Sequence, residues 1–187
     1  GVDPGMINKH VAHQMGMPCF AAGTLIATPQ GRRRVEDLGA GDLVTTPRGP
    51  QPVVWAGGRQ IGARELAARP ALQPVVIRRG ALGNDQPLIV SRQHGLAIEG
   101  RAGPVLVRAA QLAPLAQGAF RQARGRQSIG YHHILLPRHA RVLGNGAWAE
   151  TLWPGPAGLA ALGADARGEI VAALPALAAA MVVPGLL

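Results

Sequence analysis

Between residues 19 and 112 the apolar residues come in short runs, and Gly or Pro interrupts the chain about every 8 to 15 residues. The whole chain holds 26 Gly and 16 Pro among 187 residues. Runs this short that are rich in Val and Ile are typical of strands rather than helices. The pattern therefore predicts an all-β body, with strands over residues 24–28, 42–46, 52–55, 74–78, 87–90, 96–98 and 105–107.

A second β portion is expected beyond residue 130. Two strands are predicted there, at 131–136 and 141–143, and Asn145-Gly146 closes them, because both residues tolerate the positive φ of a tight turn. The polar and basic stretch 117–128 is interpreted as a loop that joins the two portions.

After Pro154 the composition changes to Ala and Leu, which favours helix. We expect a short helix over 156–162 and a second over about 166–181, with Asp165 as its N-cap. The apolar face of the second helix should pack on the β body; its residues recur at helical spacing and are Ile170, Leu174, Leu177 and Met181.

The chain is basic, with 19 Lys+Arg against 10 Asp+Glu and a net charge of +9. The arginines are mostly scattered, and aromatic residues make up 3%, which leaves little surface for stacking on bases. We therefore expect no nucleic-acid partner.

The single cysteine, Cys19, excludes a disulfide framework within one chain. No metal or other cofactor is expected, because adjacent His132 and His133 diverge on a strand and no Cys pair assists them.

Residues 1–18 are polar and are interpreted as a flexible lead-in, of which the first five resemble the remnant of a tag before Met6. They lack the apolar stretch of a secretory signal. The longest apolar run, at 170–183, spans 14 residues and is interrupted by Pro175, whereas a membrane helix needs about 18 or more. We expect no membrane span and a soluble, bacterial protein, with the compartment and the oligomeric state left open.

Three motifs follow one another along residues 19–146. The first runs from Cys19 to Thr45 and holds a leading Cys, a strand and the run Val35-Glu36-Asp37-Leu38. The second is Ser91-Arg92-Gln93-His94, and the third extends from Tyr131 through Asn145-Gly146. This set resembles Hint domains, the self-processing modules of inteins and Hedgehog C-terminal regions, and is similar to a bacterial subfamily with a short helical tail.

The resemblance implies a Hint fold with a pseudo-two-fold β body over residues 19–153, followed by a helical tail over 154–187. It also implies self-cleavage: the Cys19 thiol attacks the carbonyl of Pro18 in an N-to-S acyl shift and forms a thioester. An amide is a poor electrophile, so the attack needs a deprotonated thiol, a polarised carbonyl and a proton for the departing nitrogen.

The same resemblance assigns roles to the other motif residues. His94 would hydrogen-bond the scissile amide and protonate its nitrogen, and Ser91 would hold the same backbone. His139 and either His132 or His133 would deprotonate the thiol or stabilise the oxyanion. Adjacent residues of a strand face opposite ways, so only one of that pair can face Cys19, and we favour His133.

The sequence departs from splicing inteins, which end in His-Asn followed by Cys, Ser or Thr. Here Asn145-Gly146 is followed by Ala147, so only N-terminal cleavage is expected, with the flanking segment as substrate and water, a thiol or an amine as acyl acceptor. The ring of Pro18 restricts distortion of the scissile bond, and we expect slow or conditional cleavage. The alternative is a non-catalytic Hint-fold module that acts in binding.

Overall fold

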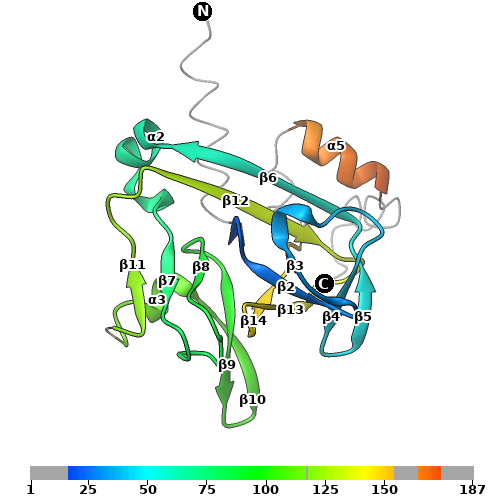
Figure 1. The fold of residues 1–187 in the computed structure, drawn as a ribbon, viewed down its shortest axis with the longest axis horizontal. Coiled ribbons are helices and arrows are strands. Elements are labelled where there is room, and N and C mark those ends of the chain that lie inside the picture. Colours follow the sequence, from blue (N-terminus) through cyan, green and yellow to red (C-terminus); the bar gives the residue numbers. More distant parts are fainter. Residues whose placement is uncertain (1–16, 117, 154–163, 174–187) are drawn as a thin grey trace, which may run out of the picture.

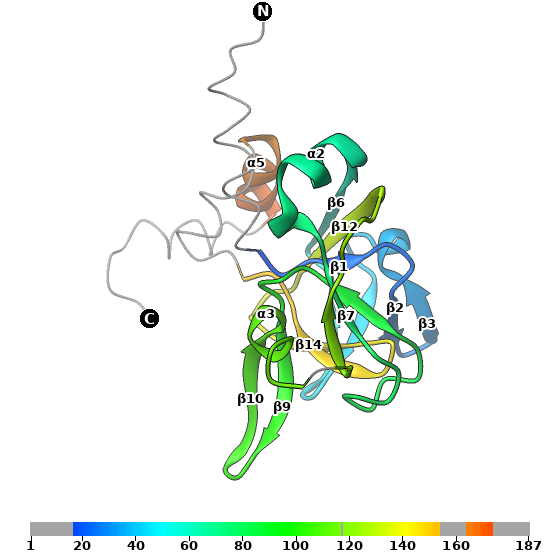
Figure 2. The same cartoon turned by 90° about the vertical axis from the view of Figure 1, so that its left-hand side faces the viewer.

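The computed structural model describes residues 17–116, 118–153 and 164–173. Its core is a pair of six-stranded sheets, shown in two views in Figures 1 and 2. The first sheet has the order β11 (Phe120–Gln122), β7 (Val75–Ile77), β8 (Leu88–Val90), β1 (Phe20–Ala21), β12 (Ser128–Leu135) and β6 (Trp55–Gly62). The second has the order β10 (Gly103–Arg108), β9 (Gly95–Gly100), β14 (Ala147–Glu150), β13 (Arg141–Gly144), β2 (Leu25–Thr28) and β3 (Gly31–Arg34).

The remaining elements are a hairpin and short helices. The hairpin pairs β4 (Leu43–Thr46) with β5 (Gly49–Pro52). The helical elements are η1 (Val35–Asp37), α2 (Ala63–Ala68), η2 (Pro70–Leu72), α3 (Ala109–Leu112) and α5 (Ala164–Ala173). Figure 1 shows α2 and α5 near opposite ends of the long β6–β12 pair, while the β9–β10 hairpin projects from the far side. The all-β prediction with a helix near the C-terminus is confirmed.

β1 passes between the two hydrophobic clusters of the body. Phe20 packs in the larger cluster, whereas Cys19 and Ala21 pack in the smaller one. This follows from the two-residue period of a strand, which sends successive side chains to opposite faces. β12 alternates in the same way, with Ile134 in the larger cluster and Tyr131 in the smaller. Cys19 thus shares a face with the odd-numbered residues of β12.

Several local predictions need correction. Residues 117–128 are not one loop, because they include strand β11 and the first residue of β12. Asn145-Gly146 does turn the chain with positive φ of 48° and 92°, but it joins β13 to β14 rather than closing the two predicted strands. Those strands, β12 and β13, belong to different sheets.

The described part of the tail is α5, which packs on the first sheet. Ile170 is buried, and Trp55 Nε1 donates a 2.8 Å hydrogen bond to Glu169 Oε2. Asp165 lies inside the first turn of this helix and is therefore not its N-cap. The predicted helix at 156–162 and the residues 174–181 lie outside the described ranges. Within those ranges, no helix is long and apolar enough to cross a membrane.

Candidate active site around Cys19

The strand register brings two distant segments of the chain to Cys19. Phe20 pairs with His132 on β12 and with Val90 on β8. One residue earlier in the same antiparallel registers, Cys19 lies between His133 and Ser91. The carbonyl oxygen of Cys19 accepts a 3.0 Å hydrogen bond from the Ser91 backbone N–H, which extends the β1–β8 ladder by one step.

His133 contacts both partners of the predicted acyl shift. Its Nδ1 lies 2.9 Å from the carbonyl oxygen of Pro18, and its Nε2 lies 3.7 Å from the sulfur of Cys19. A carbonyl can only accept, so Nδ1 carries the proton in the neutral ring and the lone pair of Nε2 faces the thiol. Burial lowers the pKa of His133 to about 4, so the ring is neutral at pH 7. Of the two adjacent histidines, His133 is the one that faces Cys19.

His132 lies on the opposite face of β12, against Gly58 of the neighbouring strand β6. A Cβ added at Gly58 would collide with its Nδ1, so the ring occupies the space that a side chain at 58 would need. His132 therefore lies on the face of β12 away from the thiol, as the alternation of side chains along a strand requires.

The thiol itself is buried and protonated. Cys19 is 4% exposed, and burial raises its pKa to about 12, although the Ser91 hydroxyl and the charge of Arg59 both lower it. Its sulfur also lies 3.5 Å from the carbonyl oxygen of Met17. Attack on the neighbouring amide therefore requires a base that takes the proton during the reaction, and Nε2 of His133 is in the position to do so.

Ser91 holds the backbone on both sides of the Pro18–Cys19 bond. The amide N–H of Cys19 donates to Ser91 Oγ at 3.1 Å, and the hydroxyl donates to the carbonyl oxygen of Met17 at 2.9 Å. The resemblance implied that His94 would make the hydrogen bond to this amide nitrogen; here Ser91 makes it.

His94 contacts the next carbonyl along the chain. Its Nδ1 lies 2.9 Å from the carbonyl oxygen of Cys19, and its Nε2 lies 3.0 Å from the backbone oxygen of Glu150. The ring is fully buried, with the ring of Phe20 edge-on at 4.4 Å. Burial lowers its pKa, while the two carbonyls and the Glu150 carboxylate raise it in part. Only the protonated ring can donate to both carbonyls.

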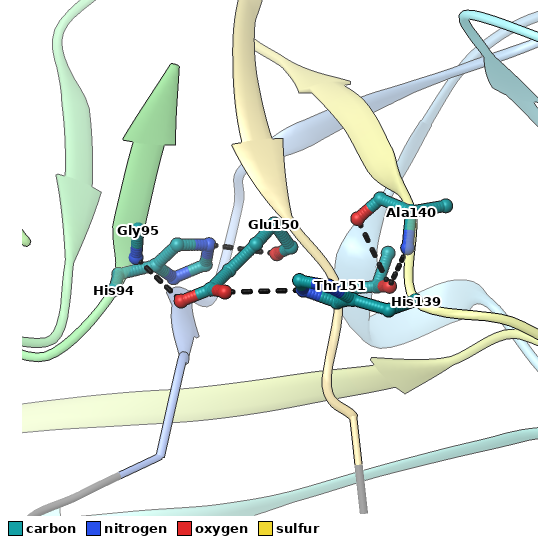
Figure 3. Close-up of polar contacts among 6 residues, drawn as sticks. All are labelled: His94, Gly95, His139, Ala140, Glu150 and Thr151. Carbon is teal, nitrogen blue, oxygen red and sulfur yellow. Dashed lines mark hydrogen bonds and ion pairs between the residues drawn. The ribbon is translucent and has the colours of Figure 1, made fainter. Parts of the chain in front are cut away.

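Glu150 links His94 to His139, as Figure 3 shows. Its Oε1 accepts a 2.7 Å hydrogen bond from the Gly95 N–H, and its Oε2 lies 3.1 Å from Nε2 of His139. Burial alone would raise the pKa of Glu150, but the hydrogen bond from His139 and the charge of His94 lower it overall. His139 therefore contacts this carboxylate, and no hydrogen bond within the described residues joins it to Cys19.

A small cavity opens beside the thiol. Its volume is about 30 Å³, which is room for a single water molecule. Cys19, Ser91 and His133 line it together with two cations, Arg59 and Arg92. Arg59 and Glu150 are the site residues that the sequence analysis missed, because each reaches the site through strand pairing and not through a local motif.

Comparison with known proteins gives one family and a set of related folds. A family model described as "Hint domain" matches residues 18–156. No curated protein matches the sequence. The solution structure of a bacterial intein-like domain from Clostridium thermocellum is similar, with a TM-score of 0.51 and 15% identity over 71% of this chain and 97% of that one. The gp41-1 intein has a TM-score of 0.46 and 14% identity over 70% of this chain and 96% of that one.

Proposed function

The chain belongs to the Hint domain family, and we propose that it cleaves its own backbone at the Pro18–Cys19 bond through a thioester, without splicing. The observation that supports this proposal best is the double contact of His133, which joins the scissile carbonyl to the thiol that would attack it.

In the first step the sulfur of Cys19 adds to the carbonyl carbon of Pro18. His133 takes the thiol proton at Nε2 and donates from Nδ1 to the carbonyl oxygen, where negative charge develops. One imidazole thus serves as base and as oxyanion donor. Arg59, which lines the cavity, adds positive charge on the same side.

In the second step the C–N bond breaks and the nitrogen of Cys19 leaves as an amine. We assign the proton that this nitrogen needs to His94, whose ring is held against the carbonyl of the same residue. Ser91 keeps the amide N–H and the Met17 carbonyl in place while the bond rearranges. The proton balance closes, because His133 gains one proton and His94 gives one.

In the third step a nucleophile attacks the thioester. Water, a thiol or an amine adds to the Pro18 carbonyl carbon, and the C–S bond breaks. The nucleophile's proton returns the sulfur of Cys19 to a thiol. The products are a released segment that ends at Pro18 and a domain that begins at Cys19.

A second function is favoured by the burial of Cys19. A thiol that is 4% exposed, with a pKa of about 12 and a neighbouring cavity of one water volume, also suits a Hint module that has no catalytic activity and serves in binding. The two functions differ in whether the purified chain loses its first 18 residues.

The test is incubation of the purified chain with dithiothreitol or hydroxylamine, followed by intact-mass measurement. Cleavage predicts loss of the mass of residues 1–18 from the native chain and no loss from Cys19→Ala. His133→Gln should slow the loss far more than its matched control His132→Gln, since His132 lies on the other face. An unchanged mass after long incubation would leave the non-catalytic module as the function.

A further inference from the structure

A large basic groove lies next to the cavity of Cys19. Its volume is about 780 Å³, and it runs between the α2–η2 segment and residues 122–127, at the end of the β6–β12 pair that carries α2 in Figure 1. No Asp or Glu lines it, and in the described part of the chain none of its arginines forms an ion pair. Those four arginines are Arg64, Arg92, Arg124 and Arg126.

The groove also contains an unsatisfied polar group. Gln73 lines it and is 7% exposed. Its Nε2 donates to the backbone oxygen of Arg126 at 3.3 Å, but its Oε1 is buried and has no hydrogen-bond partner among the described residues. A buried acceptor that has no partner is unfavourable, which sets Gln73 apart from the other residues of the groove.

Two residues line both the groove and the cavity of the thiol, namely Ala71 and Arg92. The two spaces are therefore adjacent. They differ in size by a wide margin, about 780 Å³ against about 30 Å³. A molecule in the groove could extend only a small head toward Cys19. Arg59 lines the inner space; its guanidinium pairs with Glu65, and its Nε is buried with no hydrogen-bond partner among the described residues.

We propose that this groove binds the acyl acceptor of the cleavage, and that the acceptor is a small organic anion with a thiol or amine as its nucleophilic head. The inference rests on the proposed function, because it names the class of molecule that takes the acyl group. The anionic end lies among the four arginines, because a groove lined by positive charges raises the local concentration of an anion. The head enters the cavity and reaches the thioester.

The transfer needs no oxidant or other reactant. The head of the acceptor attacks the Pro18 carbonyl carbon, the C–S bond to Cys19 breaks, and the proton of the head passes to the sulfur of Cys19. The released segment then carries the anion at its C-terminus as a new thioester or amide.

The first experiment compares three thiols on the native chain at equal thiolate concentration. These are 2-mercaptoethanesulfonate, which is anionic, 2-mercaptoethanol, which is neutral, and cysteamine, which is cationic. The anionic thiol should cleave about tenfold faster than the neutral one, and the cationic thiol slowest. The ratio should fall to about one in Arg124→Gln/Arg126→Gln. The matched control, Arg48→Gln/Arg101→Gln, removes two exposed arginines that lie outside the groove and should keep the preference.

The second experiment measures binding without cleavage. Ethanesulfonate, which cannot react, is titrated into Cys19→Ala, and amide chemical shifts are followed by NMR. Shifts centred on Gln73, Arg92 and residues 124–126 are expected. If all thiols cleave equally and no shifts occur there, the acceptor site is wrong although cleavage stands. If no thiol cleaves the native chain, the proposed function fails, and shifts in the groove would then mark an anion site that accepts no acyl group.

Discussion

Nε2 of His94 lies 3.0 Å from the backbone carbonyl oxygen of Glu150, although Nδ1 of the same ring already contacts the carbonyl oxygen of Cys19. A neutral imidazole has one N–H and can satisfy only one of these two acceptors. The protonated ring satisfies both, and the Glu150 carboxylate favours that form. Burial still lowers the pKa of His94 overall, so Glu150 and the two carbonyls offset only part of the cost of protonating the ring that we assign as the acid for the departing nitrogen.

The first prediction concerns the charge of Glu150. Glu150→Gln keeps an acceptor for the Gly95 N–H but removes the negative charge near His94. Without that charge the pKa of His94 should fall further, so fewer molecules carry the protonated ring and cleavage in dithiothreitol at pH 7 should slow several-fold. The rate should recover as the pH is lowered. Glu99→Gln, at an exposed position on β9, is the control, and equal rates in the two variants would contradict this role.

A substitution at Gly95 offers a second way to move the Glu150 carboxylate away from His94. A Cβ at this position would lie 2.6 Å from Glu150 Oε1, and the obstructing atom is the end of a flexible side chain. Gly95→Ala should therefore push the carboxylate aside at little cost in stability, about 1 kcal/mol or less. Cleavage should slow as much as in Glu150→Gln. The melting temperature and the cleavage rate, measured together, test this; a large loss of stability with an unchanged rate would speak against it.

The β body could be predicted from sequence because its strands are short Val- and Ile-rich runs bounded by Gly and Pro. The same rule fails for β6, the eight-residue partner of β12. Because β6 contains Gly57 and Gly58, the rule predicts an interruption where the structure has a continuous strand. Those glycines are needed inside the strand, since a Cβ at 57 would meet the ring of Trp55 and a Cβ at 58 the ring of His132. Glycine here makes room for aromatic rings and does not end the strand.

The candidate site was predictable only as far as motifs reach. The motifs identified Cys19, Ser91 and His94. Strand alternation indicated that only one of His132 and His133 can face the thiol, but it could not tell which of the two does. The motifs could not predict the hydrogen-bond partners of each histidine ring, because those partners depend on the register in which the strands pair. The pairing of β14 with β9 brings Glu150 to His94. The pairing of β13 with β14 sets Arg141 opposite Glu150, and His139, just before β13, contacts that carboxylate.

Asn145 gives a prediction about stability alone. It has a positive φ of 48°, its Oδ1 accepts from the Leu25 N–H at 2.8 Å, and its Nδ2 donates to the Pro87 oxygen at 3.0 Å. Asn145→Gly keeps the backbone freedom and loses both hydrogen bonds, which should cost about 1–3 kcal/mol. Asn145→Ala adds backbone strain of about 1 kcal/mol and should be less stable still. Urea unfolding measures both, and an alanine variant as stable as the glycine one would rule out the strain.

The last prediction is the pH dependence of stability that His133 causes. The unfolded ring has the ordinary pKa of 6.5, and burial lowers the folded value to about 4. Between these values the unfolded chain binds more protons, so stability from this group is fully present above pH 6.5 and is lost as the pH falls toward 4. The loss should be about 3 kcal/mol, at about 1.4 kcal/mol per pKa unit.

His94, Glu150 and other groups also make the stability of the native chain depend on pH, so the measured quantity is the difference in unfolding free energy between the native chain and His133→Gln. That difference should shift by about 3 kcal/mol in favour of the variant between pH 7 and pH 4. Ile134→Val, a change without a titratable group on the same strand, should show a constant difference, and a constant difference for His133→Gln as well would mean that its ring is not buried as described.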